Sequence, residues 1–184
     1  MATAQMQKPN VILILADDLG FADLGVTGSE IKTPNIDALA NNGMLLTSMY
    51  NCARCCPTRA SLLTGLYPHN AGVGHMGANL GTPAYQGFLR NDSATIAEHL
   101  RASGYRTLMS GKWHVAGDFM AREVDSWRVG DVDHPTPRQR GFDRFYGIVD
   151  GVTEPWCNAG GKVVELGDGT KVVDLVAFFE AEVA

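Results

Sequence analysis

The sequence has few cysteines, and their placement excludes one class of protein. Only four of its 184 residues are cysteines, and three of them, Cys52, Cys55 and Cys56, lie within five positions of one another. Only Cys157 is remote. Disulfide bonds among clustered cysteines cannot link distant segments of the chain, so a disulfide-stabilised scaffold is excluded. The cluster indicates a reactive site or a metal site.

Clustered positive charge and long apolar runs are also missing. The formal net charge is −5, and no run of Lys and Arg occurs. Because binding to a phosphate backbone needs clustered cations, we expect no nucleic-acid partner. No stretch approaches the roughly 20 apolar residues that span a bilayer, so we expect no membrane partner. The opening MATAQMQKPN lacks a charged region followed by an apolar one, which predicts a cytoplasmic product, or a periplasmic or secreted one if the true start lies upstream.

What the chain does contain is alternating strand-like and helix-like segments. The run NVILILA at residues 10–16 is apolar throughout, which is typical of a strand buried on both faces of a sheet. We therefore predict an α/β domain with a mostly parallel sheet flanked by helices. Residues 66–92 and 116–140, in contrast, have the composition of loops. The predicted strands are residues 10–16, 44–50 and 105–110, the predicted helices are 33–43, 57–64, 93–102 and 172–183, and a hairpin is predicted at 161–173.

Polar clusters follow the predicted strands at three places. Asp17 and Asp18 end the first strand, Cys55 lies at the start of a helix after the second, and Lys112 and His114 follow the third. Ligands of open α/β sheets bind beyond the carboxyl ends of the strands. We therefore predict one site that combines paired carboxylates, a thiol and cationic groups.

The chemistry of this site favours an anion together with a hard cation. The N-terminus of the helix near Pro57 presents free N–H groups, and Arg59 and Lys112 add positive charge. Two adjacent aspartates would repel each other and the anion unless a divalent cation lay between them. Oxygen ligands favour Ca²⁺ or Mg²⁺ over Zn²⁺.

Two plainer interpretations stay open at this point. Asp17 and Asp18 are also common residues of strand-ending turns. Cys52, Cys55 and Cys56 resemble a C-x-x-C motif with an extra thiol, which would indicate zinc or redox chemistry, although a zinc site needs about four ligands.

Several motifs in order make the interpretation specific. The segment CCPTRASLLTG resembles the signature of type I sulfatases, with the core residues Cys55, Pro57, Thr58 and Arg59. The likeness covers about residues 8–150 and implies that 1–184 is the N-terminal, truncated part of the catalytic domain of a formylglycine-dependent arylsulfatase in the alkaline phosphatase superfamily, with 151–184 an uncertain tail. The other matching segments are PNVILILADDLG (9–20), TPNIDALANNG (33–43), GYRTLMSGKWH (104–114) and RGFDRFYG (140–147).

The resemblance implies a nucleophile made after translation. A maturation enzyme would oxidise Cys55 to formylglycine (3-oxoalanine), whose hydrate attacks the sulfur of a sulfate ester. Its second hydroxyl then allows the sulfate to be released. The substrate would be a small-molecule or glycan sulfate ester, and Asp17, Asp18 and the modified Cys55 would ligate Ca²⁺, with Mg²⁺ as the alternative.

The resemblance also assigns roles to three cationic residues. Arg59 would hold the modified side chain and support the oxygens at the metal. Lys112 would bind the sulfate and offset charge that develops in the transition state. His114 would contact the hydrated aldehyde and act as the base that releases sulfate.

The resemblance leaves two alternative functions. A phosphonate monoester or phosphodiester hydrolase of the same superfamily can share the Cys core and the metal aspartates. An inactive, truncated remnant is the other alternative, because family members run to several hundred residues and complete the calcium site with an Asp and an Asn far downstream.

Overall fold

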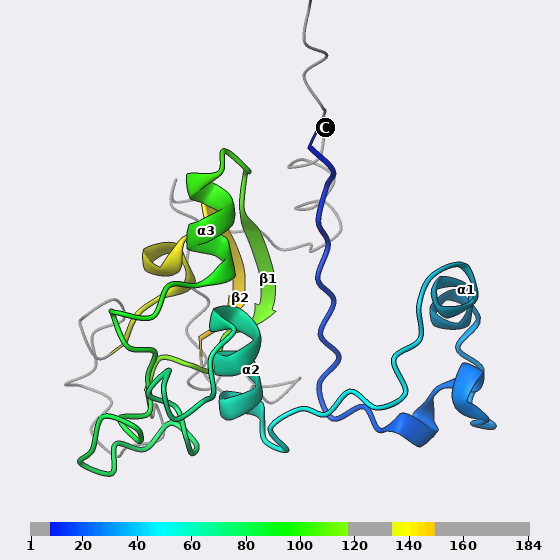
Figure 1. The fold of residues 1–184 in the computed structure, drawn as a ribbon, viewed down its shortest axis with the longest axis horizontal. Helices are drawn as coiled ribbons and strands as arrows, with labels where there is room; N and C mark the ends of the chain where they lie inside the picture. The colour runs from blue at the N-terminus through cyan, green and yellow to red at the C-terminus, as the bar shows by residue number, and fades with distance from the viewer. Residues whose placement is uncertain (1–7, 118–133, 150–184) are drawn as a thin grey trace, which may run out of the picture. The chain divides into compact units, whose positions relative to one another are not determined.

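A computed structural model describes residues 8–117 and 134–149 of the chain (Figure 1). The chain divides into two compact units, Met1–Met49 and Tyr50–Ala184, and each is described by itself. The predicted hairpin at 161–173 and the predicted helix at 172–183 lie outside the described residues. No helix within residues 8–117 and 134–149 has both the length and the hydrophobicity that spanning a bilayer requires.

The described part of the first unit is built on short helices. The predicted helix at 33–43 is confirmed: Pro34 lies in its first turn, and it ends before Gly43. Asp37 accepts hydrogen bonds from the Val26 N–H (2.9 Å) and the Thr33 hydroxyl (2.7 Å), which fix the helix to the preceding turn. The elements are η1 (Phe21–Asp23), η2 (Gly25–Thr27) and α1 (Pro34–Asn42).

Two predicted strands of this region do not form ladders in the structure. Residues 10–16 are not assigned as a strand, and Ile12 and Ile14 are 82% and 80% exposed. Residues 44–50 contain a turn instead of a strand and are also exposed. A strand needs a neighbour to accept its backbone hydrogen bonds and cover its side chains. Within the first unit no described residue pairs with either segment, so the structure does not show the predicted strands there, and the burial of residues 10–16 stays a prediction.

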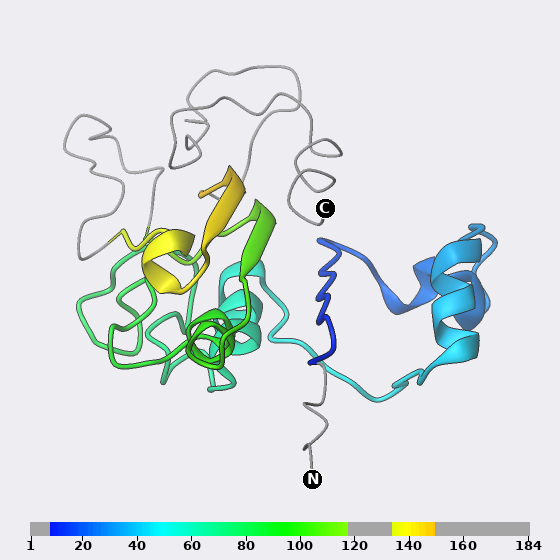
Figure 2. The same ribbon diagram turned by 90° about the horizontal axis from the view of Figure 1, so that it is seen from above.

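The second unit contains a two-stranded parallel sheet (Figures 1 and 2). Strands β1 (Leu108–Lys112) and β2 (Arg144–Ile148) lie side by side in register. Beyond β1, Trp113 N–H donates to the Ile148 carbonyl (2.8 Å) and His114 N–H to the Val149 carbonyl (2.9 Å). The predicted parallel arrangement is therefore confirmed for this pair of strands.

The boundaries of these strands differ from the sequence prediction. β1 begins at Leu108, not at Tyr105, because the Tyr105 N–H still donates to the Leu100 carbonyl at the end of the preceding helix (3.0 Å). The sequence pattern predicts no strand at the position of β2, which overlaps the RGFDRFYG motif at residues 140–147. Its Gly147 lies against Gly111, where a Cβ would collide with the Gly111 carbonyl oxygen. A close approach of two backbones explains why a glycine occurs inside a strand.

Helices α2 (Cys55–Thr64) and α3 (Ile96–Ala102) contact one another. The predicted end of α2 is confirmed, because Gly65 closes it in the left-handed conformation (φ 70°). Helix α3 begins later than predicted. Its N-cap is Thr95, whose hydroxyl accepts from Glu98 N–H (3.1 Å), whereas Ser93 donates its hydroxyl to the Arg90 carbonyl in the preceding turn.

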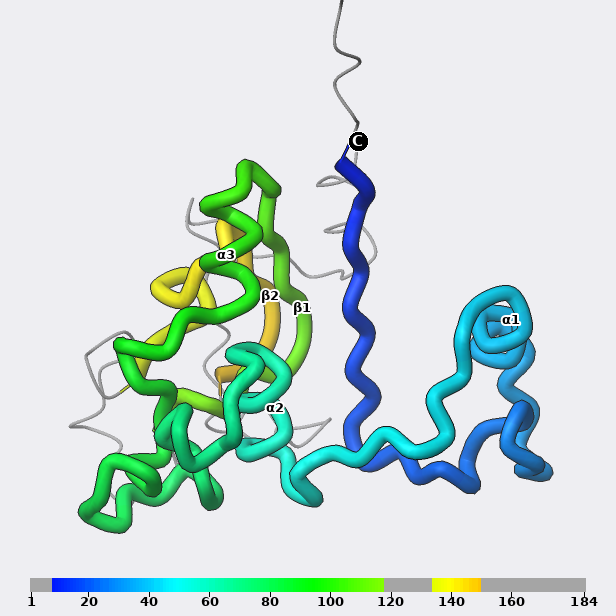
Figure 3. The backbone as a smooth tube through the Cα atoms, in the orientation of Figure 1, coloured from blue at the N-terminus to red at the C-terminus, as the bar shows by residue number. Residues whose placement is uncertain are grey.

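The segment 66–92 is irregular, as predicted, but it is not only a surface loop. It winds back on itself beside α2 (Figure 3) and buries Val73 and Leu89 completely. Short antiparallel bridges join Val73 to Tyr85 and Phe88 to Ala116. The loop thereby covers the core of the second unit, whose buried members are Cys56, Ala60, Ala71, Val73, Leu89, Trp113, Val115, Ala116, Phe145 and Val149.

A buried arginine ties this loop to α3 and to the 3₁₀ helix η4 (Pro137–Arg140). Arg140 is only 4% exposed, and its Nε donates to Oε1 of Glu98 (2.9 Å). Its other nitrogens donate to backbone carbonyls of Leu89, Arg90 and Ser93. One guanidinium therefore satisfies four acceptors between Leu89 and Glu98, a stretch more than 40 residues before it in the sequence.

This network predicts a defined response of the chain's stability to acid. Burial opposes ionisation of Glu98, but hydrogen bonds from Arg140 and Thr95 outweigh it and hold the pKa of Glu98 below its ordinary value. Because the pKa of Glu98 is lower in the folded chain, its carboxylate stabilises the fold at pH values above the pKa of Glu98 in the unfolded chain. This stabilisation is lost as the pH falls through the pKa of Glu98 in the folded chain. We expect Glu98→Gln to lower the urea midpoint at neutral pH and to reduce the further loss on acidification to about pH 4.

The matched control for this prediction is Glu30→Gln, at an exposed glutamate outside the network. It should leave both midpoints nearly as in the parent chain. An acid-induced loss of stability that is the same in Glu98→Gln and in the parent would contradict the role given to this carboxylate.

Candidate active site

The start of helix α2 is prepared by a tight turn. Ala53 adopts a left-handed conformation (φ 61°), and its N–H donates to the Asn51 side chain (2.7 Å). The Cys52 N–H donates to the Thr58 hydroxyl (3.2 Å), which joins this turn to the first turn of the helix. As a result Cys55 is the first residue of α2, two positions earlier than the predicted start. The free N–H groups of a helix start favour negative charge beside it.

His114 is held where the chain leaves β1. Its neighbour Trp113 is fully buried and donates its indole N–H to the Pro135 carbonyl (2.8 Å). Trp113 also packs edge-to-face on Phe142, with ring centroids 6.2 Å apart. His114 has φ 57°, a conformation uncommon for residues other than glycine, and is 9% exposed. Such a conformation persists where the surroundings enforce it, and it often marks a functional position.

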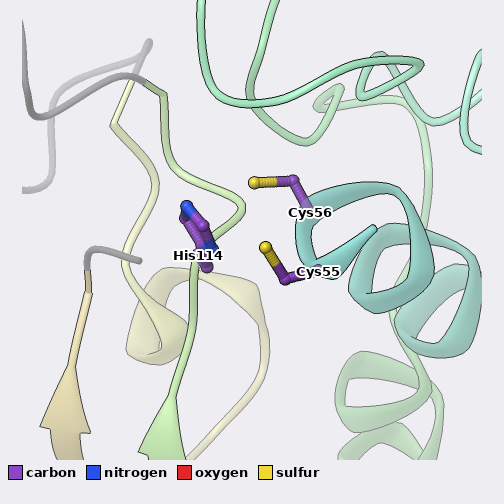
Figure 4. A group of neighbouring side chains, drawn as sticks. All are labelled: Cys55, Cys56 and His114. Atoms are coloured by element: carbon purple, nitrogen blue, oxygen red, sulfur yellow. The ribbon is translucent and has the colours of Figure 1, made fainter. Parts of the chain in front are cut away.

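These two elements bring a histidine and two thiols together (Figure 4). The sulfur atoms of Cys55 and Cys56 and one ring nitrogen of His114 all lie within 4.8 Å of one another. Figure 4 shows both thiols directed from the start of α2 toward His114. We call these three residues the thiol–imidazole cluster.

The two thiols of the cluster differ in environment. Cys55 is half-buried, while Cys56 is fully buried. Burial, and next the neighbouring Cys55, raise the pKa of Cys56 to about 12, although the positive charge of Lys112 acts to lower it. Cys56 is therefore a neutral thiol near pH 7, and the Lys112 ammonium lies close enough to act on it.

Arg59 connects the helix to the end of β1. Its side chain is 8% exposed, and one guanidinium N–H donates to the Lys112 carbonyl. Through this link the structure brings together all four residues predicted to be catalytic: Cys55, Arg59, Lys112 and His114. The roles assigned to each remain predictions.

The predicted metal aspartates lie in the first unit. Asp17 and Asp18 are both exposed, directly after the extended run, and Asp18 has φ 54°. Carboxylate oxygens are donors of the hard type that Ca²⁺ takes, so the pair fits the implied cation in chemistry. Because the two units are described separately, a cation shared between these aspartates and residue 55 remains a prediction.

The histidines of the 66–92 segment do not join the cluster. His75 is exposed, and its Nε2 lies 3.5 Å from a guanidinium nitrogen of Arg54. His69 is exposed and packs edge-to-face on Tyr85. From this segment Met76 and Gly77 approach the site: the Met76 sulfur lies 4.0 Å from the Cys55 sulfur, and the Gly77 backbone forms a hydrogen bond with the Cys56 side chain.

Sequence reasoning did not assign Cys56 to the predicted sulfatase site. Its thiol belongs to the core, but it also faces His114. The signal that could have revealed this was its place in the first turn of a helix, beside a residue already assigned to the site. Met76 gave no comparable signal, since it lies in a Gly-rich segment with no regular spacing.

Comparison with known proteins identifies the protein family of this chain. The sulfatase family profile matches residues 9–163, and the chain belongs to this family. An arylsulfatase of Klebsiella aerogenes is 36% identical over 159 residues, covering 85% of this chain and 31% of that protein. The chain thus spans about a third of the length of this curated relative.

Solved structures agree with this assignment. The chain is similar to Ps i-CgsB, with 40% identity and a TM-score of 0.63 over 79% of this chain and 29% of the other. It is also similar to the phosphonate monoester hydrolase of Agrobacterium radiobacter, with 30% identity and a TM-score of 0.52 over 76% of this chain and 25% of the other. The likeness confirms the sulfatase-like fold for the part of the domain that the chain covers.

Proposed function

We propose that this chain carries the nucleophile-bearing part of a sulfuric ester hydrolase of the arylsulfatase type. The observation that carries the proposal is the convergence of Cys55, Arg59, Lys112 and His114 at the start of α2. A thiol at a helix N-terminus, flanked by an imidazole and two permanent cations, suits an anionic substrate and a nucleophile derived from that thiol.

The formylglycine and cation that the family implies, and the chain's own residues, would have separate roles in ester hydrolysis. Formylglycine at position 55 would supply a hydrated aldehyde as the nucleophile, and a divalent cation held by Asp17, Asp18 and that residue would offset its charge. Lys112 and the N–H groups of α2 bind and orient the anionic ester group. Arg59, fixed to the end of β1, holds the side chain at position 55 in place. His114 is positioned to accept a proton there.

Relatives support a sulfate ester of a small molecule or glycan as the substrate. A second structure of Ps i-CgsB, 39% identical to this chain, is described as a complex with k-i-k-neocarrahexaose. Another similar structure, 32% identical, comes from work on the metabolism of glycosaminoglycans. We propose the same broad class for this chain, with a formylglycine-generating enzyme as the partner that matures it.

A second candidate function is phosphonate monoester hydrolysis, which the likeness to the Agrobacterium enzyme favours. The cationic site of α2 and Lys112 would accept either anion. The two candidates differ in which ester is turned over faster.

The experiment compares an aryl sulfate with an aryl phosphonate, using the protein that contains this chain, co-expressed with a maturation enzyme. We expect kcat/KM for the sulfate to exceed that for the phosphonate by at least about tenfold, equivalent to 1.4 kcal/mol of transition-state stabilisation. Faster phosphonate turnover would replace the first candidate with the second. Absence of turnover of both esters, with formylglycine present at position 55, would refute both.

A further inference from the structure

The thiol–imidazole cluster has a composition that sulfate ester hydrolysis does not require. The proposed nucleophile uses Cys55 and the proposed base is His114, but Cys56 has no part in that chemistry. Its thiol nevertheless lies within 4.8 Å of both partner atoms (Figure 4). Three ligating atoms, two from the start of α2 and one from the segment that follows β1, therefore face one small volume.

The spacing is close to that of a tetrahedral zinc site. With Zn–S near 2.3 Å and Zn–N near 2.0 Å, ligand atoms in such a site lie roughly 3.5–3.8 Å apart. Ligand atoms that are now up to 4.8 Å apart would have to approach by about 1 Å to reach this spacing, through small side-chain rotations on both sides of the cluster. Met76 adds a further sulfur, 4.0 Å from Cys55.

The donor set also selects the kind of metal. Thiolate and imidazole ligands suit Zn²⁺ and other thiophilic ions, whereas Ca²⁺ and Mg²⁺ take oxygen. Coordination replaces the thiol protons, and two thiolates neutralise the charge of one divalent cation. This neutrality matters because Lys112 and Arg59 already make the surroundings positive.

We propose that, while residue 55 is still cysteine, Cys55, Cys56 and His114 bind a thiophilic divalent cation such as Zn²⁺. It shares position 55 with the predicted hard-cation site, but its other ligands are Cys56 and His114 instead of Asp17 and Asp18. It exists only before maturation, because conversion of Cys55 to an aldehyde removes one thiolate ligand. A bound cation would also shield the Cys55 sulfur from any reagent that must reach it.

The test uses the 184-residue chain made without a maturation enzyme, with peptide mass confirming a thiol at position 55. Zn²⁺ is titrated anaerobically in competition with a chromophoric chelator, and Co²⁺ serves as a spectroscopic probe of thiolate coordination. We expect one ion per chain and a cobalt–thiolate charge-transfer band. Cys56→Ser should weaken Zn²⁺ binding by at least about tenfold.

The matched control is Cys52→Ser, since Cys52 is a free, half-buried thiol outside the cluster. It should leave Zn²⁺ affinity within about twofold. Asp17→Asn should do the same, so that loss of the hard-cation site and loss of this one are distinguishable. Equal weakening by Cys52→Ser and Cys56→Ser would overturn the proposal, as would the absence of a cobalt–thiolate band.

A second measurement does not depend on how any variant folds. In the parent chain, Zn²⁺ should slow alkylation of Cys55 by iodoacetamide at least about tenfold, while Cys52 in the same molecule reacts at an unchanged rate. Peptide mass spectrometry reports both sites at once. If Zn²⁺ protects both residues equally or neither, the proposed site does not exist.

Discussion

Replacing Cys55 by alanine is expected to lower aryl sulfate turnover by about 10⁴-fold or more, because it removes the atom from which the nucleophile is made. Alanine has no sulfur to oxidise, so no aldehyde can form at this position. The substitution is small and lies on a half-buried side chain at the start of α2, so the helix itself should remain. The measurement is kcat/KM of the protein containing this chain, co-expressed with a maturation enzyme.

Two neighbouring thiols provide the controls for this experiment. Cys52→Ala removes a sulfur whose nearest polar partner is the Ser61 hydroxyl, 3.5 Å away, and should retain most of the activity. Cys56→Ala tests which of the adjacent thiols is the precursor. Peptide mass should show conversion to formylglycine at position 55 in the parent and in both control variants. Activity that survives in Cys55→Ala and is lost in Cys56→Ala would move the nucleophile by one residue.

Replacing Arg140 by alanine is expected to destabilise the chain by roughly 3 kcal/mol, the largest effect predicted for a residue away from the site. The substitution leaves the Glu98 carboxylate and the carbonyls of Leu89, Arg90 and Ser93 without their common donor. Acceptors that are buried without a donor cost more than the net strength of the bonds that are lost.

The measurement is the midpoint of urea denaturation, monitored by circular dichroism. The dependence of the free energy of unfolding on urea concentration should stay unchanged. Arg138→Ala is the matched control, because Arg138 belongs to the same 3₁₀ helix but is exposed, and it should change stability by no more than about 0.5 kcal/mol. Arg140→Lys keeps the positive charge but loses the planar guanidinium and its multiple N–H donors. Its urea midpoint should fall between those of the two alanine variants. Equal midpoints for the two alanine variants would contradict the structural role given to Arg140.

Local features of the fold could be predicted from the sequence. The start of α1 at Pro34 and the end of α2 at Gly65 follow from backbone preferences that act over a few residues. The parallel arrangement was also indicated, since apolar strands that alternate with helices favour it. Membership of the sulfatase family could be predicted because the order and spacing of its sequence motifs are specific.

Long-range contacts decided the rest. Burial of the 66–92 segment, the pairing of β2 with β1 and the guanidinium network of Arg140 each depend on residues distant in the sequence, and no local pattern encodes them. The run at 10–16 has the composition of a central strand, yet composition cannot supply the neighbouring strand that it needs.

The residue types available for chemistry follow from the order of amino acids alone: a thiol at a helix start, two adjacent carboxylates and a Lys-x-His segment after a strand. That Cys56 faces His114, and that Arg59 reaches the Lys112 carbonyl, follows from the three-dimensional fold. Ligand spacing and hydrogen-bond geometry depend on how α2 packs against the end of β1, and side chains of the whole core set that packing.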